Sequence, residues 1–417
     1  MSPLFGVHRV SLFDMVIALS GCLDLVSPVV VNHHKRVAYT ALTIAEALGL
    51  PGDLRHELCI AALLHDSGAL SAQERIDVLE FDLRNPREHA EMGYRLYKDF
   101  GRFAGPARLI RDHHTPWGEA GDQIPIGCHI IHLSDRVDVL IDREQPILGQ
   151  VDSILEKIKA RKGTLFRPDV VDILEKLAEK PVFWLDMVSA DIFDILSKKL
   201  TFRTVLLDGP GLNKLAKLFS HIIDFRSPFT STHSAGVAAT SKALAQLMSF
   251  SPWECEMMQT AGYLHDLGKL AIPKEILDKP APLNDEEYIL IKSHTYYTYR
   301  VLDLIPGLEL IKTWGAFHHE RLDGQGYPFG ITGEGIPLGS RIMAVADVFT
   351  AITEDRPYRA GMEAEAAQRV LHQMAQGGAL DGEVVQLLVE NFDHIDAIRA
   401  EAQREAFEAY SLSQGEN

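Results

Sequence analysis

The chain is poor in cysteine, in basic residues and in long apolar runs. Its 417 residues include four cysteines, none in CxxC spacing, which argues against a disulfide framework or a thiolate zinc site and favours buried free thiols. Acidic residues outnumber basic ones by 58 to 41, so the net charge of −17 disfavours binding to DNA or to anionic membranes. No apolar run reaches the roughly 20 residues that span a bilayer, and the N-terminus lacks a signal-peptide layout. We expect a soluble, cytoplasmic protein.

Strand patterns are also scarce. Runs of period two bounded by turn residues are nearly absent, whereas apolar residues at three- and four-residue spacing recur, as in 37–50, 237–248 and 170–180. This periodicity predicts amphipathic helices, and we expect an all-α fold.

An internal repeat organises the chain. The matched pairs of segments are 23–50 with 223–250, 61–70 with 261–270, 124–140 with 336–352, and 163–174 with 377–388. The offset is a constant 200 residues through the first two pairs. We therefore predict two tandem copies of one helical domain, over 1–200 and 201–417, joined near 209–211, where a Gly-Pro-Gly sequence interrupts the helical pattern.

Histidine is abundant, with 18 residues, and its clusters follow the repeat. The spacing from His33 to His65 is 32 residues, and so is that from His233 to His265. The candidate ligands of the second copy are His233, His265, Asp266, His294, His318, His319 and Asp347. The corresponding residues of the first copy are His33, His65, Asp66, His89, His113, His114 and Asp135. Imidazole and carboxylate ligands without a thiolate suit iron, manganese or zinc.

The size of this ligand set indicates the chemistry. Five imidazoles and two carboxylates are too many for one ion, but they suit two ions that share a bridging aspartate. Two ions about 3.5–4 Å apart can activate water and hold a phosphate oxygen. Phosphoester hydrolysis is the reaction that this set favours.

The second copy has an insertion beside its His-His pair. His114 is 11 residues before Pro125, whereas His319 is 18 residues before Pro337, an insertion of seven residues. The glycines and prolines of the longer segment predict an irregular loop, and a loop next to a histidine cluster is a candidate binding lip.

The order His, His-Asp, His, His-His, Asp resembles the HD superfamily of metal-dependent phosphohydrolases. The second copy resembles the HD-GYP group in particular, through HDLGKLAIP (265–273), HHERLDGQGYP (318–328) and ADVFTAITEDRPYR (346–359). The resemblance implies a helical domain that hydrolyses cyclic dinucleotides, usually cyclic di-GMP, to the linear pGpG and in some cases to GMP.

The resemblance also implies roles for individual residues. The seven candidates of the second copy match the metal ligands of the family, with Asp266 as the bridging carboxylate. Lys269 would contact a phosphate oxygen or assist the leaving group, so Asp266 and Lys269 are the candidate catalytic residues. The expected substrate-binding residues are Lys269, Arg356, Arg359 and Tyr327.

The second copy departs from the family pattern in three places. Phe229 stands where members with three metals have a glutamate, so we expect two divalent ions, iron or manganese. The usual HPxxG motif reads HTYYT over 294–298, and its tyrosines, with Tyr299, could pack in the core or stack on a base. Thr350 occupies a position where an aspartate is common.

The first copy keeps every ligand position but lacks other parts of the site. Ala69 replaces the lysine, the GYP loop is absent, and neither arginine has a clear equivalent. This copy could be a second phosphohydrolase, a regulatory partner with or without an additional metal, or a structural remnant.

Several alternatives stay open for the whole protein. The tandem arrangement also resembles phosphodiesterases of 3′,3′-cyclic GMP-AMP, which makes that dinucleotide an alternative substrate. A non-catalytic sensor of cyclic dinucleotides and a dNTP phosphohydrolase are competing functions. The sequence leaves open a homodimer or a protein signalling partner, and it does not identify the metal.

Overall fold

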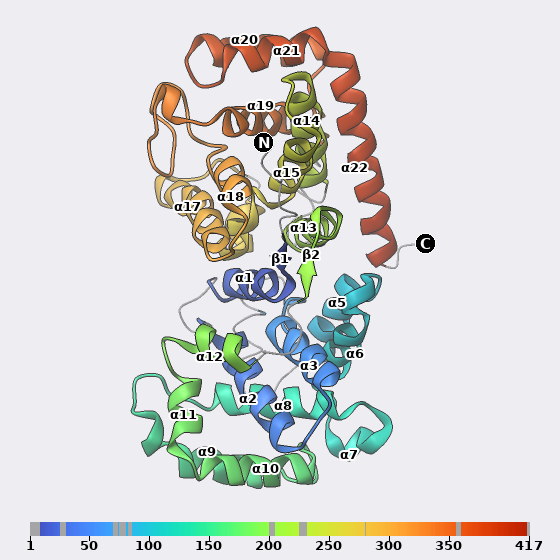
Figure 1. Ribbon diagram of the computed structural model, residues 1–417, viewed down its shortest axis with the longest axis vertical. Coiled ribbons are helices and arrows are strands. Elements are labelled where there is room, and N and C mark those ends of the chain that lie inside the picture. Colours follow the sequence, from blue (N-terminus) through green and yellow to red (C-terminus); the bar gives the residue numbers. More distant parts are fainter. Residues whose placement is uncertain are drawn as a thin grey trace, which may run out of the picture. The chain divides into compact units, whose positions relative to one another are not determined.

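A computed structural model (Figure 1) describes residues 9–25, 31–69, 74, 81, 86–199, 205–224, 232–279, 281–355 and 360–414. The chain divides into two compact units. The N-terminal unit comprises Leu23–Val205, and the C-terminal unit comprises Met1–Cys22 together with Leu206–Asn417. The matched repeat segments from 23 to 174 lie in the N-terminal unit and those from 223 to 388 in the C-terminal unit. The predicted copies of 1–200 and 201–417 differ from these units, because Met1–Cys22 belongs to the C-terminal unit and 201–205 to the N-terminal one.

The prediction of an all-α fold is confirmed. The N-terminal unit contains the helices α2 (His33–Ala47), α3 (Gly52–Leu64), α5 (Pro86–Tyr97), α6 (Ala104–Asp112), α7 (Trp117–Ala120), α8 (Ile126–Val139), α9 (Val151–Lys159), α10 (Pro168–Ala178), α11 (Pro181–Met187) and α12 (Ile192–Lys199). Short 3₁₀ turns lie at η2 (Gly101–Phe103), η3 (Gly121–Gln123) and η4 (Ile147–Gly149).

The C-terminal unit has the same helical character. Its helices are α1 (Leu12–Asp24, which continues two residues beyond the unit), α13 (Gly209–Asp224), α14 (His233–Leu247), α15 (Pro252–Leu264), α16 (Lys274–Leu277), α17 (Asp285–Asp303), α18 (Glu309–Ala316), α19 (Leu338–Thr353), α20 (Ala364–Gln376), α21 (Gly382–Glu390) and α22 (Phe392–Gln414). The 3₁₀ turns are η5 (Leu267–Ala271) and η6 (Gly333–Gly335). Within the described ranges, the sheet content is one antiparallel pair, β1 (Val10–Ser11) with β2 (Leu206–Leu207).

The repeat is visible as equivalent helices. In the N-terminal unit α2 packs against α3 and α8, and α5 packs against α6. In the C-terminal unit α14 packs against α15 and α19, and α17 packs against α18. The buried faces of these helices carry small and branched apolar residues, such as Val37 and Ala41 in α2 and Val237 and Leu244 in α14. Burial of each large apolar side chain contributes about 1.5–3 kcal/mol.

Local capping signals position the helices of the second copy. Ser251 and Glu254 form a capping box at the start of α15, and Asn284 and Glu287 form one at the start of α17. Each box satisfies two backbone N–H groups that the first helical turn would otherwise leave without a partner. These helices therefore begin at defined residues, which sets where their histidines lie.

Two expectations about composition can be compared with the fold. The four cysteines are buried free thiols, as predicted. Among the described helices, none is both long and apolar enough to cross a bilayer.

Candidate metal centres

The seven candidate ligands of each unit come from equivalent places in its helical framework. They lie at the start of α2 or α14, in the turn after α3 or α15, within α5 or α17, in the turn after α6 or α18, and within α8 or α19. The equivalent pairs are His33 and His233, His65 and His265, Asp66 and Asp266, His89 and His294, His113 and His318, His114 and His319, and Asp135 and Asp347. All are buried except His319, which is partly exposed.

In the C-terminal unit, Asp266 lies between two groups of histidines. Its Oδ2 is 3.2 Å from Nε2 of His265, and its Oδ1 is 3.3 Å from Nε2 of His294. Oδ1 of Asp347 is 3.0 Å from Nε2 of His233 and 3.9 Å from Nε2 of His265. Because its two oxygens face different histidines, Asp266 has the geometry of a bridging carboxylate.

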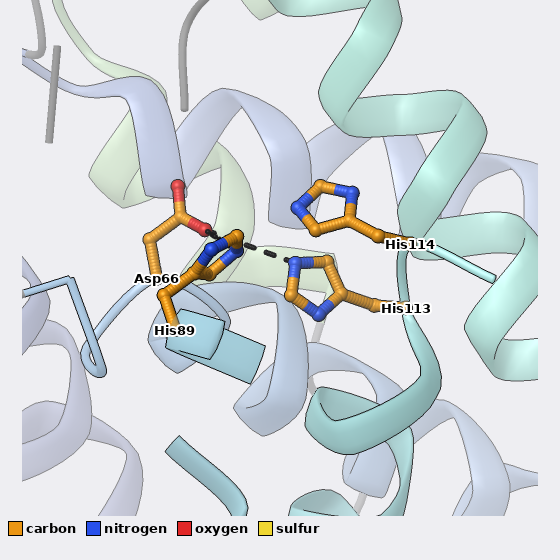
Figure 2. Close-up of side chains that lie close together, drawn as sticks. All are labelled: Asp66, His89, His113 and His114. Atoms are coloured by element: carbon orange, nitrogen blue, oxygen red, sulfur yellow. Dashed lines mark ion pairs between the residues drawn. The ribbon is translucent and has the colours of Figure 1, made fainter. Parts of the chain in front are cut away.

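The N-terminal unit repeats this arrangement around Asp66. Its Oδ2 is 3.3 Å from Nε2 of His65, while its Oδ1 is 3.4 Å from Nε2 of His89 and 3.7 Å from Nε2 of His113. Figure 2 shows the rings of His89, His113 and His114 around this carboxylate, with dashed lines to His89 and His113. One ligand atom from each of these four residues lies within 4.8 Å of the other three.

The hydrogen bonding of the rings fits metal binding. Nδ1 of His65 donates to the carbonyl of Ala62 at 2.9 Å, and Nδ1 of His265 donates to that of Gly262 at 2.7 Å. A ring whose Nδ1 carries the proton has its Nε2 lone pair available for a metal. Within the described residues, no hydrogen bond satisfies the Nε2 atoms of either histidine, although both are buried. A cation would satisfy these converging atoms, because unpaired buried polar groups are costly.

Charge pairing shifts the pKa values within the C-terminal centre. Burial alone would lower the pKa of His233, but the carboxylates of Glu354 and Asp347 raise it to about 10. Burial lowers the pKa of His319 to about 3. Burial would raise the pKa of Asp266, yet the neighbouring His265 and the Lys269 ammonium hold it well below its usual range. The aspartate is therefore anionic, as a ligand must be.

A carboxylate outside the ligand set orients the first histidine of each centre. Nδ1 of His33 is 2.7 Å from Oδ2 of Asp138, and Nδ1 of His233 is 3.2 Å from Oε2 of Glu354. The position equivalent to Asp138 in the second copy is Thr350, the departure noted in the sequence. The orienting carboxylate has therefore moved four residues along the chain, to Glu354. Sequence reasoning missed both carboxylates, because their spacing to the histidines is not local.

The predicted catalytic lysine contacts the bridging aspartate. Nζ of Lys269 is 2.5 Å from Oδ2 of Asp266. Burial alone would lower the pKa of Lys269, but the Asp266 carboxylate outweighs this effect and raises the pKa. The equivalent residue of the N-terminal unit, Ala69, is fully buried. Among the described residues, a lysine beside this aspartate is thus a feature of the C-terminal centre.

The N-terminal centre has a different cation. Nη2 of Arg136 is 2.6 Å from Oδ2 of Asp135, and Nε of the same arginine is 3.1 Å from that oxygen. Oδ1 of Asp135 is 3.5 Å from Nε2 of His33. The residue equivalent to Arg136 in the second copy is Val348, so no guanidinium comes from that position.

Close backbone packing joins the turn after α15 to α17. A Cβ atom at Gly268 would lie 1.9 Å from the carbonyl oxygen of His294, and one at Gly68 would lie 2.1 Å from that of His89. The hydroxyl of Thr298 accepts from the N–H of Gly268 at 2.9 Å and donates to the carbonyl of His265 at 3.0 Å. The altered HPxxG segment is therefore continuous helix, tied to the turn through its last threonine.

The insertion after His319 is an irregular loop, as predicted, with η6 as its short 3₁₀ turn. Glu320, which is buried, accepts hydrogen bonds from the N–H groups of Phe329 at 2.7 Å and Ile331 at 2.9 Å. The ring of Tyr327 packs beside that of His319, with their centroids 4.8 Å apart. The loop is therefore anchored at one buried carboxylate and lies next to a candidate ligand.

Lys292 is a further cation at this loop that sequence reasoning did not identify. Its Nζ lies 4.5 Å from the ring centre of Tyr288 and 5.7 Å from that of Tyr327. Tyr299 instead stacks on Phe317 at 5.9 Å, so it packs within the unit. The only sequence signal for Lys292 is its place two residues before His294.

Three residues from the sequence analysis fall outside the described ranges. They are Phe229, Arg356 and Arg359.

Comparisons with known proteins agree with this geometry. Residues 30–140 and 217–384 each match a family model described as HD domain. The chain is 31% identical over 400 residues to a 3′3′-cGAMP-specific phosphodiesterase 1 of Vibrio cholerae, covering 92% of each protein. It is 34% identical over 302 residues to a cyclic di-GMP phosphodiesterase of Thermotoga maritima, covering 63% of this chain and 81% of that protein.

A solved structure is also similar. It is that of a cyclic GMP-AMP-specific phosphodiesterase of V. cholerae, with a TM-score of 0.65 and 25% identity, covering 92% of this chain and 98% of the other. Each of the two matches falls within one compact unit and spans all seven candidate ligands of that unit. The chain therefore belongs to the HD-domain family of metal-dependent phosphohydrolases and carries two HD domains in tandem.

Proposed function

We propose that the C-terminal unit is a metal-dependent cyclic dinucleotide phosphodiesterase of the HD-GYP type. The observation that carries the proposal is the combination, in one unit, of a complete ligand cluster, Lys269 on the bridging carboxylate, and the structured loop over 320–332. The N-terminal unit shares the cluster but lacks the lysine and the loop.

Two divalent ions, iron or manganese, suit the ligand set. One would be held by His233, His265, Asp347 and Oδ2 of Asp266, and the other by His294, His318, His319 and Oδ1 of Asp266. When bound, such ions make water a stronger nucleophile and stabilise negative charge on phosphoryl oxygens.

The chain's own side chains supply binding and orientation. Asp266 presents one oxygen to each group of histidines, and Glu354 fixes the ring of His233. The Lys269 ammonium is positioned to stabilise negative charge on the phosphate, as preorganised cations do in phosphoryl transfer. Tyr327, beside His319, borders the site, and we assign Arg356 and Arg359 to the substrate phosphates on the resemblance alone.

The reaction is hydrolysis of one of the two phosphodiester bonds in the ring. Water adds across a P–O3′ bond, which leaves a 5′-phosphate on one nucleotide and a free 3′-hydroxyl on the other. The product is a linear dinucleotide.

We propose 3′,3′-cyclic GMP-AMP as the preferred substrate, with cyclic di-GMP as the competitor. The relatives that span 92% of the chain, and so both units, are named for cyclic GMP-AMP. The cyclic di-GMP phosphodiesterase of T. maritima spans 63% of it. Whole-chain similarity therefore favours the hybrid dinucleotide.

The test is a substrate panel with the full chain, loaded separately with iron or manganese. Cyclic GMP-AMP, cyclic di-GMP and dNTPs are assayed by chromatography of the products. We expect the linear dinucleotide from cyclic GMP-AMP at the highest kcat/KM, and no turnover in Asp266→Ala. The equivalent Asp66→Ala serves as the matched variant, in which turnover is expected to persist.

Three outcomes would contradict the proposal. Binding of cyclic dinucleotides without cleavage by the metal-loaded protein would indicate a sensor. Preferential turnover of dNTPs would indicate a nucleotide phosphohydrolase. Turnover that is lost in Asp66→Ala but retained in Asp266→Ala would place the chemistry in the other unit.

A further inference from the structure

Four side chains of the N-terminal unit form a ligand group that is complete without any other residue. They are Asp66, His89, His113 and His114, and each of them is at most 6% exposed. Among the described residues, no hydrogen bond reaches Oδ1 of Asp66, Nε2 of His89, Nε2 of His113 or either ring nitrogen of His114. One ligand atom from each of the four side chains lies within 4.8 Å of the others. A cation would satisfy these converging atoms, because leaving buried polar groups without a hydrogen bond costs about 1–3 kcal/mol each.

This group is more closed than its counterpart in the C-terminal unit. His114 is buried, whereas the equivalent His319 is partly exposed. Three imidazoles and one carboxylate oxygen can fill all four positions of a tetrahedral ion, as in a structural site. The equivalent donor set of the C-terminal unit differs in the partial exposure of its last histidine. Ala69 replaces the lysine that would contact a phosphate.

The second metal position of the N-terminal unit is altered by Arg136. Its guanidinium binds Oδ2 of Asp135 through two nitrogens and is almost fully buried. The guanidinium, which stays protonated, therefore occupies Oδ2 of Asp135 and leaves only Oδ1 of that carboxylate for a metal ion. In the C-terminal unit, Val348 takes the place of this arginine.

We propose that the N-terminal unit holds a single divalent ion, ligated by Oδ1 of Asp66 and by His89, His113 and His114, as a closed structural site. The donor set of three nitrogens and one oxygen suits Zn²⁺ or Fe²⁺. The ion cross-links the turn after α3, helix α5 and the turn after α6, so it stabilises the unit. This site is independent of the activity proposed for the C-terminal unit.

Metal content of a variant with an intact N-terminal unit tests the proposal. The double variant His265→Ala/His318→Ala removes ligands from both groups of the C-terminal centre. By elemental analysis of the purified full chain, we expect it to retain one ion per chain. Adding His113→Ala, the counterpart of His318→Ala, should remove that ion. Adding His129→Ala should not, because His129 lies on α8 with its Nε2 bonded to the carbonyl of Gly121.

Each result decides the proposal. A folded double variant without metal would overturn the site, and one with two ions would overturn the role of Arg136. Retention of the ion after His113→Ala would overturn the ligand assignment. If the double variant does not fold, anomalous diffraction from crystals of the unmodified protein provides the test. One peak among the four ligands is expected, and the absence of a peak there, in crystals grown with added zinc, would refute the site.

Thermal unfolding gives a readout that does not depend on activity. Removal of the remaining ion from the double variant by a chelator should lower its Tm by several degrees, because the ion binds the folded state and not the unfolded one. The triple variant with His113→Ala should show no such shift, and an equal shift in both variants would contradict a structural role.

Discussion

Nδ1 of His233 lies 3.2 Å from Oε2 of Glu354, so a carboxylate that is not itself a candidate ligand fixes the ring of the first histidine of the C-terminal centre. In the N-terminal unit Asp138 does the same for His33, from a position equivalent to Thr350. In both units a carboxylate thus orients the first histidine, but the carboxylate comes from different positions of the repeat.

The first prediction follows from this exchange. Replacement of Glu354 by Ala should weaken metal binding by the C-terminal centre about 10- to 100-fold, since the His233 ring loses its orienting partner. Metal titration of the chelator-treated protein measures the effect. Adding Thr350→Asp should partly restore affinity, because it places a carboxylate where Asp138 lies in the other unit. Glu390→Ala, on the exposed end of α21, is the control, and an equal loss there would contradict the orienting role.

A second prediction concerns Gly268. In Gly268→Ala, the new Cβ would overlap the carbonyl oxygen of His294, so α17 must move away from the turn that carries Asp266. We expect loss of metal from the C-terminal centre and loss of turnover, measured by elemental analysis and by the dinucleotide assay. Gly382→Ala is the matched control, because its Cβ meets no atom within 4 Å. Full metal content in Gly268→Ala would show that the close approach is not required.

A third prediction separates metal binding from charge stabilisation. Replacement of Lys269 by Met should lower kcat for the cyclic dinucleotide by roughly 10²- to 10³-fold, the usual effect of removing a group that stabilises developing charge. Metal content should stay unchanged, because the metal-ligand set does not include the lysine. Lys274→Met, which removes a lysine paired with Asp278, controls for loss of charge. A parallel loss of metal and activity would assign Lys269 a structural role instead.

A fourth prediction concerns pH. Burial raises the pKa of Asp224 to about 7, although Ser234 donates a hydrogen bond to it at 2.9 Å. The folded state therefore favours the protonated acid. Its contribution to stability is complete below the ordinary pKa of about 4 and is lost as the pH rises through about 7.

The measurement for this prediction is urea unfolding of chelator-treated protein at several pH values. Asp224→Asn, which stays neutral, should be more stable than the unmodified chain at pH 8 by more than about 1 kcal/mol and should lose that advantage at low pH. The same difference at every pH would show that Asp224 does not titrate in this range.

The sequence alone predicted the all-α fold and indicated the candidate ligands. Histidine pairs at repeated spacing and helical periodicity are local patterns, and they indicated two helical repeats and the candidate ligands of each. The same patterns identified the loop insertion after His319. These features can be recognised from sequence because helical periodicity and paired histidines are patterns within a few consecutive residues.

Only the tertiary structure showed which side chains orient or form ion pairs with the candidate ligands. Glu354 reaches His233 across 121 positions of sequence, and Arg136 neutralises Asp135 in one unit alone. Such contacts depend on how helices distant in sequence pack, and packing leaves no periodic signal along the chain. The sequence by itself thus determined two helical repeats with matching sets of candidate metal ligands. The tertiary structure decided their burial, their orienting carboxylates and the cation beside each aspartate, because these properties arise from the three-dimensional surroundings of a side chain.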